Sequence, residues 1–160
     1  MNLLRVAPQE PKMPPWRSPR NGYAAWVLST FAGSEPGIGR FYVDLAANHP
    51  TIESTTYELE QRGWNGICIE PNPEYVSLLK AQRKCAVVAA PIDSEERDVS
   101  FEFAGTMGGI EDARFDNRVG VTGRNVHKMR TRKLGDVLSE AAAPRVIDFL
   151  SLDVEGKRAP

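Results

Sequence analysis

Two acidic residues near the ends of short apolar segments are the first candidates for chemistry in this sequence. Glu70 closes the segment GICIE at 66–70, and Asp44 lies in the earlier segment RFYVDLA at 40–46. A carboxylate at the end of a buried strand can accept hydrogen bonds from both hydroxyls of a ribose. Glu70 would serve a dinucleotide or S-adenosylmethionine equally well, and the alternative is that it is a solvated strand end.

The residues that follow Asp44 distinguish between these two ligands. A dinucleotide site favours the pattern GxGxxG, which lets bare backbone approach a pyrophosphate. Residues 44–50 contain no glycine, which argues against a nucleotide-dependent oxidoreductase. The small Ala46 and Ala47 leave room for a nucleoside, and Asp44 and Asn48 offer polar groups to a ligand with a sulfonium cation and an amino-acid tail. S-adenosylmethionine is such a ligand, although Asp44 could instead cap local backbone groups.

Four short apolar segments form the framework that would position these residues. Their β-branched and nearly continuous apolar content is typical of strands covered on both faces. They lie at 40–46, 66–70, 85–90 and 146–154. Helices are predicted at 23–31, 52–62, 73–84 and 134–142. Because βαβ units give parallel strands, we expect an α/β fold, a Rossmann-like parallel sheet with helices on both faces.

The region between the third and fourth of these strands breaks the alternation. DVSFEF at 98–103 alternates polar and apolar residues, and glycines follow it closely. This pattern predicts a β-hairpin-like insertion with a return strand at 127–132, whereas 111–125 is polar and predicts no regular element. A sheet that ends on the strong strand at 146–154 leaves an apolar edge uncovered. We therefore expect the fold to be incomplete at its C-terminal end.

Composition restricts the class of protein. The chain has 160 residues, 41% hydrophobic and 26% charged, and a net charge of -1, values typical of one globular domain without a general attraction to nucleic acid or anionic lipid. The proline-rich residues 1–22 are expected to be a flexible leader. No stretch approaches the ~20 apolar residues of a membrane span, and no signal peptide is evident, which favours a cytoplasmic location. Cys68 and Cys85 lack metal-site spacing and are expected to be buried free thiols.

Five segments together resemble FkbM-type S-adenosylmethionine-dependent methyltransferases. They are VDLAAN at 43–48, GWNGICIEPNPEY at 63–75, CAVVAAPID at 85–93, GGI at 108–110 and IDFLSLDVEG at 147–156. The resemblance covers residues 23–156 and implies that 23–160 is the N-terminal part of a class I methyltransferase domain. It also implies S-adenosylmethionine as the methyl donor and, as acceptor, an oxygen of a sugar or similar small metabolite.

The resemblance assigns roles to particular residues. It matches Asp44, Ala46 and Asn48 to the family's glycine-rich donor loop and Glu70 to its ribose-binding acid. Ile92 and Asp93 match the loop beside the adenine, and Asp153, Glu155 and Gly156 match the acidic loop near the transferred methyl. Two positions depart from the family, because Ala46 and Pro50 stand where glycine is usual. An added Cβ and a fixed φ at these positions would narrow the donor pocket.

Methyl transfer to a hydroxyl also needs a group that takes the proton. Asp153 and Glu155 are the candidates for this catalytic role, and the alternative is that they orient the acceptor or bind no ligand.

Residues 114–133 contain an excess of basic side chains. Lys or Arg stands at positions 114, 118, 124, 128, 130, 132 and 133, whereas Asp116 is the one acid in this stretch. This basic run would suit an anionic small-molecule or glycan acceptor, or it is a solvated insertion balanced elsewhere. Few aromatic residues accompany it, which argues against nucleic acid. A non-catalytic truncated remnant of the fold is the main alternative function.

Overall fold

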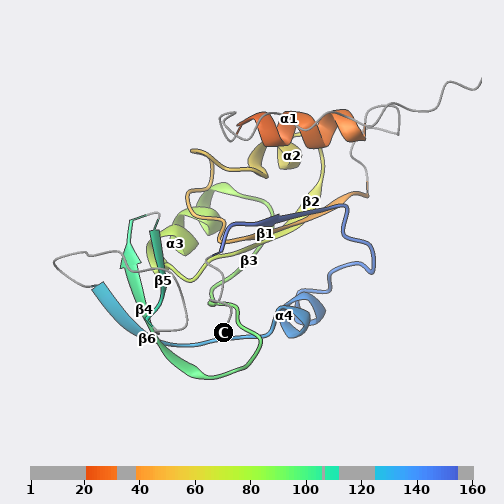
Figure 1. The fold of residues 1–160 in the computed structure, drawn as a ribbon. Coiled ribbons are helices and arrows are strands. Elements are labelled where there is room, and N and C mark those ends of the chain that lie inside the picture. The colour runs from red at the N-terminus through yellow and green to blue at the C-terminus, as the bar shows by residue number, and fades with distance from the viewer. Residues whose placement is uncertain (1–20, 32–38, 106, 112–124, 155–160) are drawn as a thin grey trace, which may run out of the picture.

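The computed structural model describes residues 21–31, 39–105, 107–111 and 125–154 (Figure 1). The expected leader, apart from its last two residues, lies outside the described residues, as do Glu155 and Gly156. Helix α1 (Asn21–Thr30) opens the described part of the chain. No helix among the described residues is long and apolar enough to cross a membrane.

A four-stranded parallel sheet forms the centre of the fold. Its strands are β1 (Phe41–Leu45), β2 (Asn65–Ile69), β3 (Ala86–Val88) and β7 (Phe149–Leu152). Their spatial order is β3-β2-β1-β7, and Asp44 in β1 lies opposite Cys68 in β2 and Ser151 in β7. The chain therefore builds outward from β1 to β3 and then returns to the other side of β1. The predicted α/β, Rossmann-like parallel sheet is confirmed.

Helices cover both faces of this sheet because its strands present alternate residues to two apolar clusters. On one face Tyr42 and Cys68 pack with Leu59 of α2 (Tyr57–Gln61) and Leu79 of α3 (Pro73–Gln82). On the other face Val43 and Ile67 pack with Val137 of α4 (Leu134–Glu140). Figure 1 shows α1 and α2 on one side of the sheet and α4 on the other.

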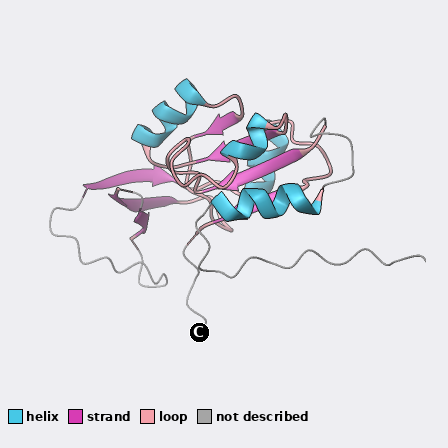
Figure 2. Ribbon diagram, turned by 90° about the horizontal axis from the view of Figure 1, so that it is seen from above, coloured by secondary structure: helices cyan, strands magenta, loops and turns pink. Residues whose placement is uncertain are grey.

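The insertion between β3 and α4 forms a second, antiparallel sheet. Its strands are β4 (Asp98–Ala104), β5 (Met107–Ile110) and β6 (Asn125–Arg130), in the order β5-β4-β6. Val99, Phe101, Phe103 and Ile110 form its own small apolar cluster. Figures 1 and 2 show this sheet at one side of the parallel sheet. The predicted hairpin is confirmed, with the return strand two residues earlier than expected.

Single residues in the sequence predicted some helix boundaries correctly, but the start of α2 was predicted wrongly. Gly63 has a φ of +88° after α2, as a left-handed C-cap requires, and Pro73 is the first residue of α3. The helix expected at 52–62 is only Tyr57–Gln61. Glu53 explains part of the difference, because its φ of +56° does not fit a right-handed helix. The Ser54 hydroxyl then accepts the N–H groups of Thr56 and Tyr57, next to the first turn of α2.

Candidate functional site

Open α/β sheets bind ligands at the carboxyl-terminal edge of their strands, beside the point where strand order reverses. In this parallel sheet that point lies at β1. The loop after β1 bends over β2, because the backbone amides of Ala46 and Ala47 both donate to the Ile69 carbonyl, at 3.0 and 3.2 Å. Ala46 and Asn48 both have positive φ, 64° and 53°. The amide side chain of Asn48 donates to the Ala46 carbonyl at 3.1 Å.

Asp44 is a buried carboxylate that accepts a hydrogen bond from a neutral hydroxyl group. Its side chain lies on the sheet face covered by α2, and the residue is only 3% exposed. Thr56 Oγ1 donates to Oδ2 at 2.5 Å, and Ser151, which lies opposite Asp44 in β7, bonds the Thr55 hydroxyl at 2.8 Å. Burial raises the pKa of Asp44, although the hydroxyls of Thr56 and Ser151 oppose the shift. The hydrogen bond of this side chain thus goes to another side chain and not to a local backbone group.

Glu70 joins two loops at the same edge. It is 3% exposed and is therefore no solvated strand end. Its Oε1 accepts the backbone N–H of Asn72 at 2.8 Å, and its Oε2 accepts that of Asn48 at 2.9 Å. Burial raises the pKa of Glu70, although both backbone hydrogen bonds act to lower it. Each carboxylate oxygen offers about two acceptor sites, so both oxygens keep capacity for further donors.

Ile92 and Asp93 lie in the loop after β3 and connect it to the second sheet. Ile92 forms an isolated bridge with Arg132, and the Asp93 amide donates to the Arg132 carbonyl at 3.0 Å. The Asp93 carboxylate pairs with Arg97 at 2.8 Å and accepts the Ser94 amide at 2.7 Å. Their predicted position beside the adenine stays a prediction.

Asp153 follows β7 directly and is exposed to solvent. Its backbone amide donates to the carbonyl of Leu45 at 3.3 Å, which brings it beside the end of β1. Its charge also acts to raise the pKa of Asp44. The structure therefore brings Asp153, Asp44 and Glu70 to one edge, while Glu155 lies outside the described residues.

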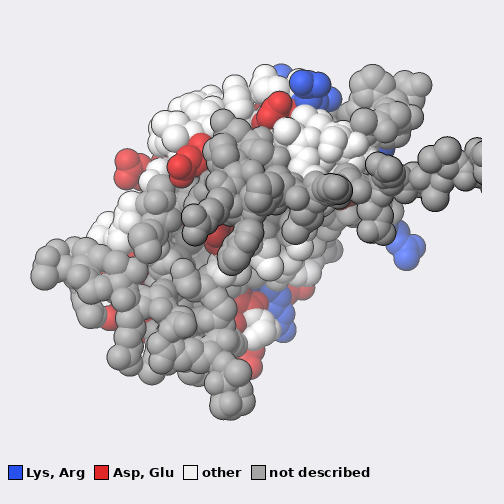
Figure 3. Space-filling view, turned by 45° about the horizontal axis from the view of Figure 1, so that its top comes forward, with Lys and Arg blue, Asp and Glu red and all other residues white. Residues whose placement is uncertain are grey.

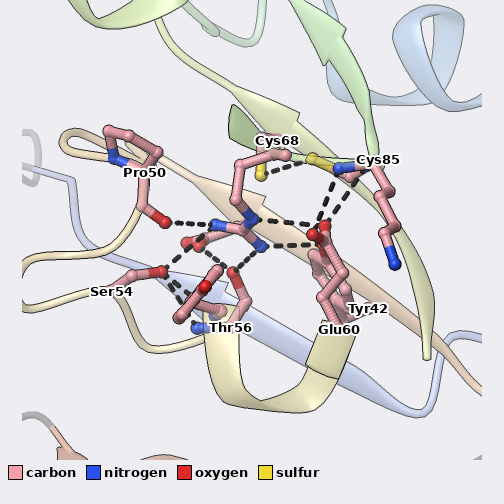
Figure 4. A network of polar contacts seen from close by, with 11 residues as sticks. Tyr42, Pro50, Ser54, Thr56, Glu60, Cys68 and Cys85 are labelled. Carbon is pink, nitrogen blue, oxygen red and sulfur yellow. Dashed lines mark hydrogen bonds and ion pairs between the residues drawn. The ribbon is translucent and has the colours of Figure 1, made fainter. Parts of the chain in front are cut away.

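Arg83 is the centre of a buried polar network that the sequence did not indicate. Its side chain is fully buried, and Figure 4 shows Pro50, Ser54, Thr56, Glu60 and Tyr42 around it. Nε donates to Glu60 Oε2 at 3.2 Å. The acceptors of Nη1 are the Pro50 carbonyl and the Ser54 hydroxyl, and those of Nη2 are the hydroxyls of Tyr42 and Thr56. These acceptors match the number of N–H groups on a guanidinium.

Glu60 is the negative partner in this network. Burial acts to raise its pKa, but the Lys84 amide, the Arg83 charge and the Tyr42 hydroxyl together hold the pKa of Glu60 below its ordinary value. Through Thr56, which bonds both Arg83 and Asp44, the network reaches the candidate site. Neither Arg83 nor Glu60 carried a recognisable signal, because both stand in polar helical segments that look solvated.

Ala46 is a non-glycine residue in a left-handed conformation, which costs an L-residue roughly 1–2 kcal/mol. We expect Ala46→Gly to raise the free energy of unfolding by about 0.5–1 kcal/mol, since glycine removes that strain but adds unfolded-state entropy. Urea denaturation would measure the change. The matched control is Ala47→Gly, because Ala47 is buried and is not among the residues with positive φ. Ala47→Gly should lower stability, and a lower stability of Ala46→Gly would contradict the assignment of strain.

The basic run is partly balanced by acids where the structure describes it. Arg130 lies 3.6 Å from Asp98 and 3.7 Å from Glu96, and Arg132 pairs with Glu140. Lys128 donates to the Ser100 hydroxyl. On the face in Figure 3, blue and red side chains are scattered and the described residues form no continuous blue patch. Residues 114, 118 and 124 lie outside the described part.

Comparison with protein families matches residues 44–157 to the Methyltransferase FkbM domain. The match begins at Asp44 and includes Glu70, Asp93 and Asp153, so every candidate residue in the described part of the chain lies within it. Comparisons with curated proteins and with solved structures found no match.

Proposed function

Since the chain belongs to the FkbM methyltransferase domain family, we propose that it transfers a methyl group from S-adenosylmethionine to a hydroxyl of a sugar or similar small metabolite. One observation carries the proposal. Asp44 lies in β1 and Glu70 directly follows the neighbouring parallel strand β2, so both lie at the carboxyl edge beside the reversal of strand order. That is the edge at which open α/β sheets bind nucleosides. We also propose a cytoplasmic location for this activity.

The residues at this edge fit the donor in charge and in hydrogen-bonding capacity. Glu70 retains acceptor sites on both oxygens after binding the amides of Asn48 and Asn72, which suits the paired hydroxyls of a ribose. Asp44 is a buried carboxylate whose hydrogen bond comes from the neutral hydroxyl of Thr56. A cationic group of the ligand would offset the cost of burying that charge.

The acceptor would approach from the β7 side of this edge. S-adenosylmethionine supplies an electrophilic methyl group when bound. Asp153 is exposed and lies next to the end of β1, so it can accept the proton of an incoming hydroxyl or orient it. Glu155 follows two residues later and shares this proposed role. The glycine-free loop after β1 gives a pyrophosphate no close backbone approach, which disfavours an oxidoreductase.

Asp44→Asn tests the donor site. We expect it to weaken binding of S-adenosylmethionine at least tenfold, about 1.4 kcal/mol, because the negative charge beside the ligand is lost. The free energy of unfolding at neutral pH should stay equal or rise, since a charge that burial disfavours is removed and the Thr56 hydroxyl can still donate to the amide oxygen. Isothermal titration calorimetry and urea denaturation would measure the two effects.

Asp98 is exposed, and Asp98→Asn is the matched control. It should change neither the affinity for S-adenosylmethionine nor the free energy of unfolding. Thermal-shift measurements with S-adenosylmethionine, S-adenosylhomocysteine and NAD would complete the test. Stabilisation by NAD alone would overturn the proposal. Stabilisation by none of the three would favour a non-catalytic remnant of the fold.

A further inference from the structure

A pocket at the opposite, amino-terminal edge of the parallel sheet takes no part in the proposed methyl transfer. It has a volume of about 320 Å³, and its lining includes Glu60, Trp64, Lys84 and Cys85. Cys85 is partly exposed, and its backbone precedes the first residue of β3. A cysteine thiol therefore stands at the wall of a pocket large enough for part of a small molecule.

A second thiol lies behind the first. Cys68 in β2 is fully buried, and its Sγ is 3.0 Å from the Sγ of Cys85. The two strands explain this proximity, because Cys68 lies opposite Val87 in the parallel register and Cys85 precedes Val87 by two residues on the same face. Figure 4 shows the two sulfur atoms facing each other. A disulfide needs an approach of only about 1 Å from this position. The expectation that both thiols are free is confirmed, but only Cys68 is fully buried.

The surroundings give the two sulfurs different reactivities. The hydrogen bond with Cys68, together with the nearby charge of Arg83, lowers the pKa of Cys85 although burial opposes the shift. The same hydrogen bond, followed by burial, raises the pKa of Cys68. The thiolate is the nucleophilic form of cysteine. Cys85 is thus the sulfur that attacks first, and it is also the one that the pocket exposes.

We propose that Cys85 and Cys68 form a redox-active dithiol that reacts with a small disulfide, of the glutathione disulfide class, entering this pocket. The Cys85 thiolate attacks one sulfur of that disulfide, a Cys85 mixed disulfide forms, and one glutathione thiolate leaves and takes up a proton. Cys68 then loses its proton and attacks the Cys85 sulfur, so that a Cys68–Cys85 bond forms and the second glutathione leaves with that proton. Two protein thiols are oxidised and one small disulfide is reduced to two thiols.

The oxidised pair would lie against the buried network around Arg83. The backbone amides of Lys84 and Cys85 both donate to the Glu60 carboxylate, so the segment that carries the attacking sulfur is already fixed. The disulfide would close a loop between β2 and β3, and closing such a loop restricts the unfolded chain. Oxidation should therefore raise the melting temperature, by at least about 5 °C.

The test incubates the whole purified chain in glutathione buffers, alkylates free thiols under denaturing conditions, and measures intact mass and peptide maps. The wild-type chain should lose roughly 2 Da and take up no alkylating agent, as an internal disulfide requires. Cys68→Ser should instead accumulate a stable glutathione adduct at Cys85, of roughly 305 Da. Cys85→Ser should be modified at least about tenfold more slowly, because Cys68 is buried and protonated.

Three outcomes would overturn the proposal. They are two alkylatable thiols in the wild-type chain after oxidation, a lasting adduct at Cys85 in the presence of Cys68, and faster modification of Cys68 than of Cys85. Circular dichroism would first confirm that both serine variants fold. If Cys68→Ser does not fold, the labelling rates of Cys85 and Cys68 in the wild-type chain still show which thiol reacts first, and the proposal requires Cys85. None of these readouts uses a methyl donor, so they are independent of the proposed function.

Discussion

Replacing Arg83 by leucine should lower the free energy of unfolding by about 3–5 kcal/mol, because removal of one partner leaves an uncompensated buried charge. Glu60 would keep its charge while losing the cation bonded to it at 3.2 Å. The carbonyl of Pro50 and the hydroxyls of Tyr42 and Ser54 would also lose a donor. Typical domains have only 5–15 kcal/mol of stability, so this variant should be marginally folded.

Urea denaturation followed by circular dichroism would measure this loss. Arg62→Leu is the matched control, because Arg62 is exposed and should change stability by less than about 0.5 kcal/mol. Arg83→Lys should recover little, since an ammonium group has three N–H donors in place of the five of a guanidinium. A loss below about 1 kcal/mol for Arg83→Leu would show that the network does not support the fold.

Glu70→Gln should impair both the fold and donor binding, in contrast with Asp44→Asn. Glutamine has one side-chain oxygen, so the amide of either Asn48 or Asn72 loses its acceptor. Leaving a buried N–H unsatisfied costs about 1–3 kcal/mol. Part of this loss is offset, because burial raises the pKa of Glu70 and the neutral side chain avoids that desolvation cost. Loss of a ribose acceptor should also weaken S-adenosylmethionine binding at least tenfold, about 1.4 kcal/mol.

The two effects of Glu70→Gln are separated by measuring urea denaturation and calorimetric titration on the same preparation. Glu74→Gln is a matched control, because Glu74 is exposed in the first turn of α3 and should alter stability only by a few tenths of a kcal/mol. Undiminished stability together with undiminished donor affinity in Glu70→Gln would mean that this carboxylate neither holds the loops nor binds the ligand.

Local signals in the sequence predicted the central sheet and several boundaries. The apolar runs around Val43, Ile67 and Val87 are strands because their side chains are covered by helices on both faces, and such coverage leaves a continuous apolar pattern. Gly63 and Pro73 marked the end of one helix and the start of the next, since each has a backbone preference that acts locally. These features depend on neighbouring residues and can therefore be read along the chain.

The polar contacts could not be read in this way, because their partners come from distant segments. Arg83 and Glu60 resemble solvated helix residues in sequence, and only the packing of α2 against the end of α3 buries them together. Thr56 was expected inside a helix, whereas its hydroxyl bonds Asp44 in β1. The sequence predicts that Glu70 binds a ligand, but the hydrogen bonds it accepts from two loop amides depend on backbone conformations that periodicity does not reveal.

The number of segments that converge on Arg83 has a consequence for folding cooperativity. Its acceptors belong to β1, to the turns before α2 and to α2 itself, while the arginine follows α3. In a partly assembled chain the guanidinium would be desolvated before all of its acceptors are in place. An unpaired buried polar group of this kind raises the free energy of that state. The network therefore penalises intermediates and couples these elements into one all-or-none unit.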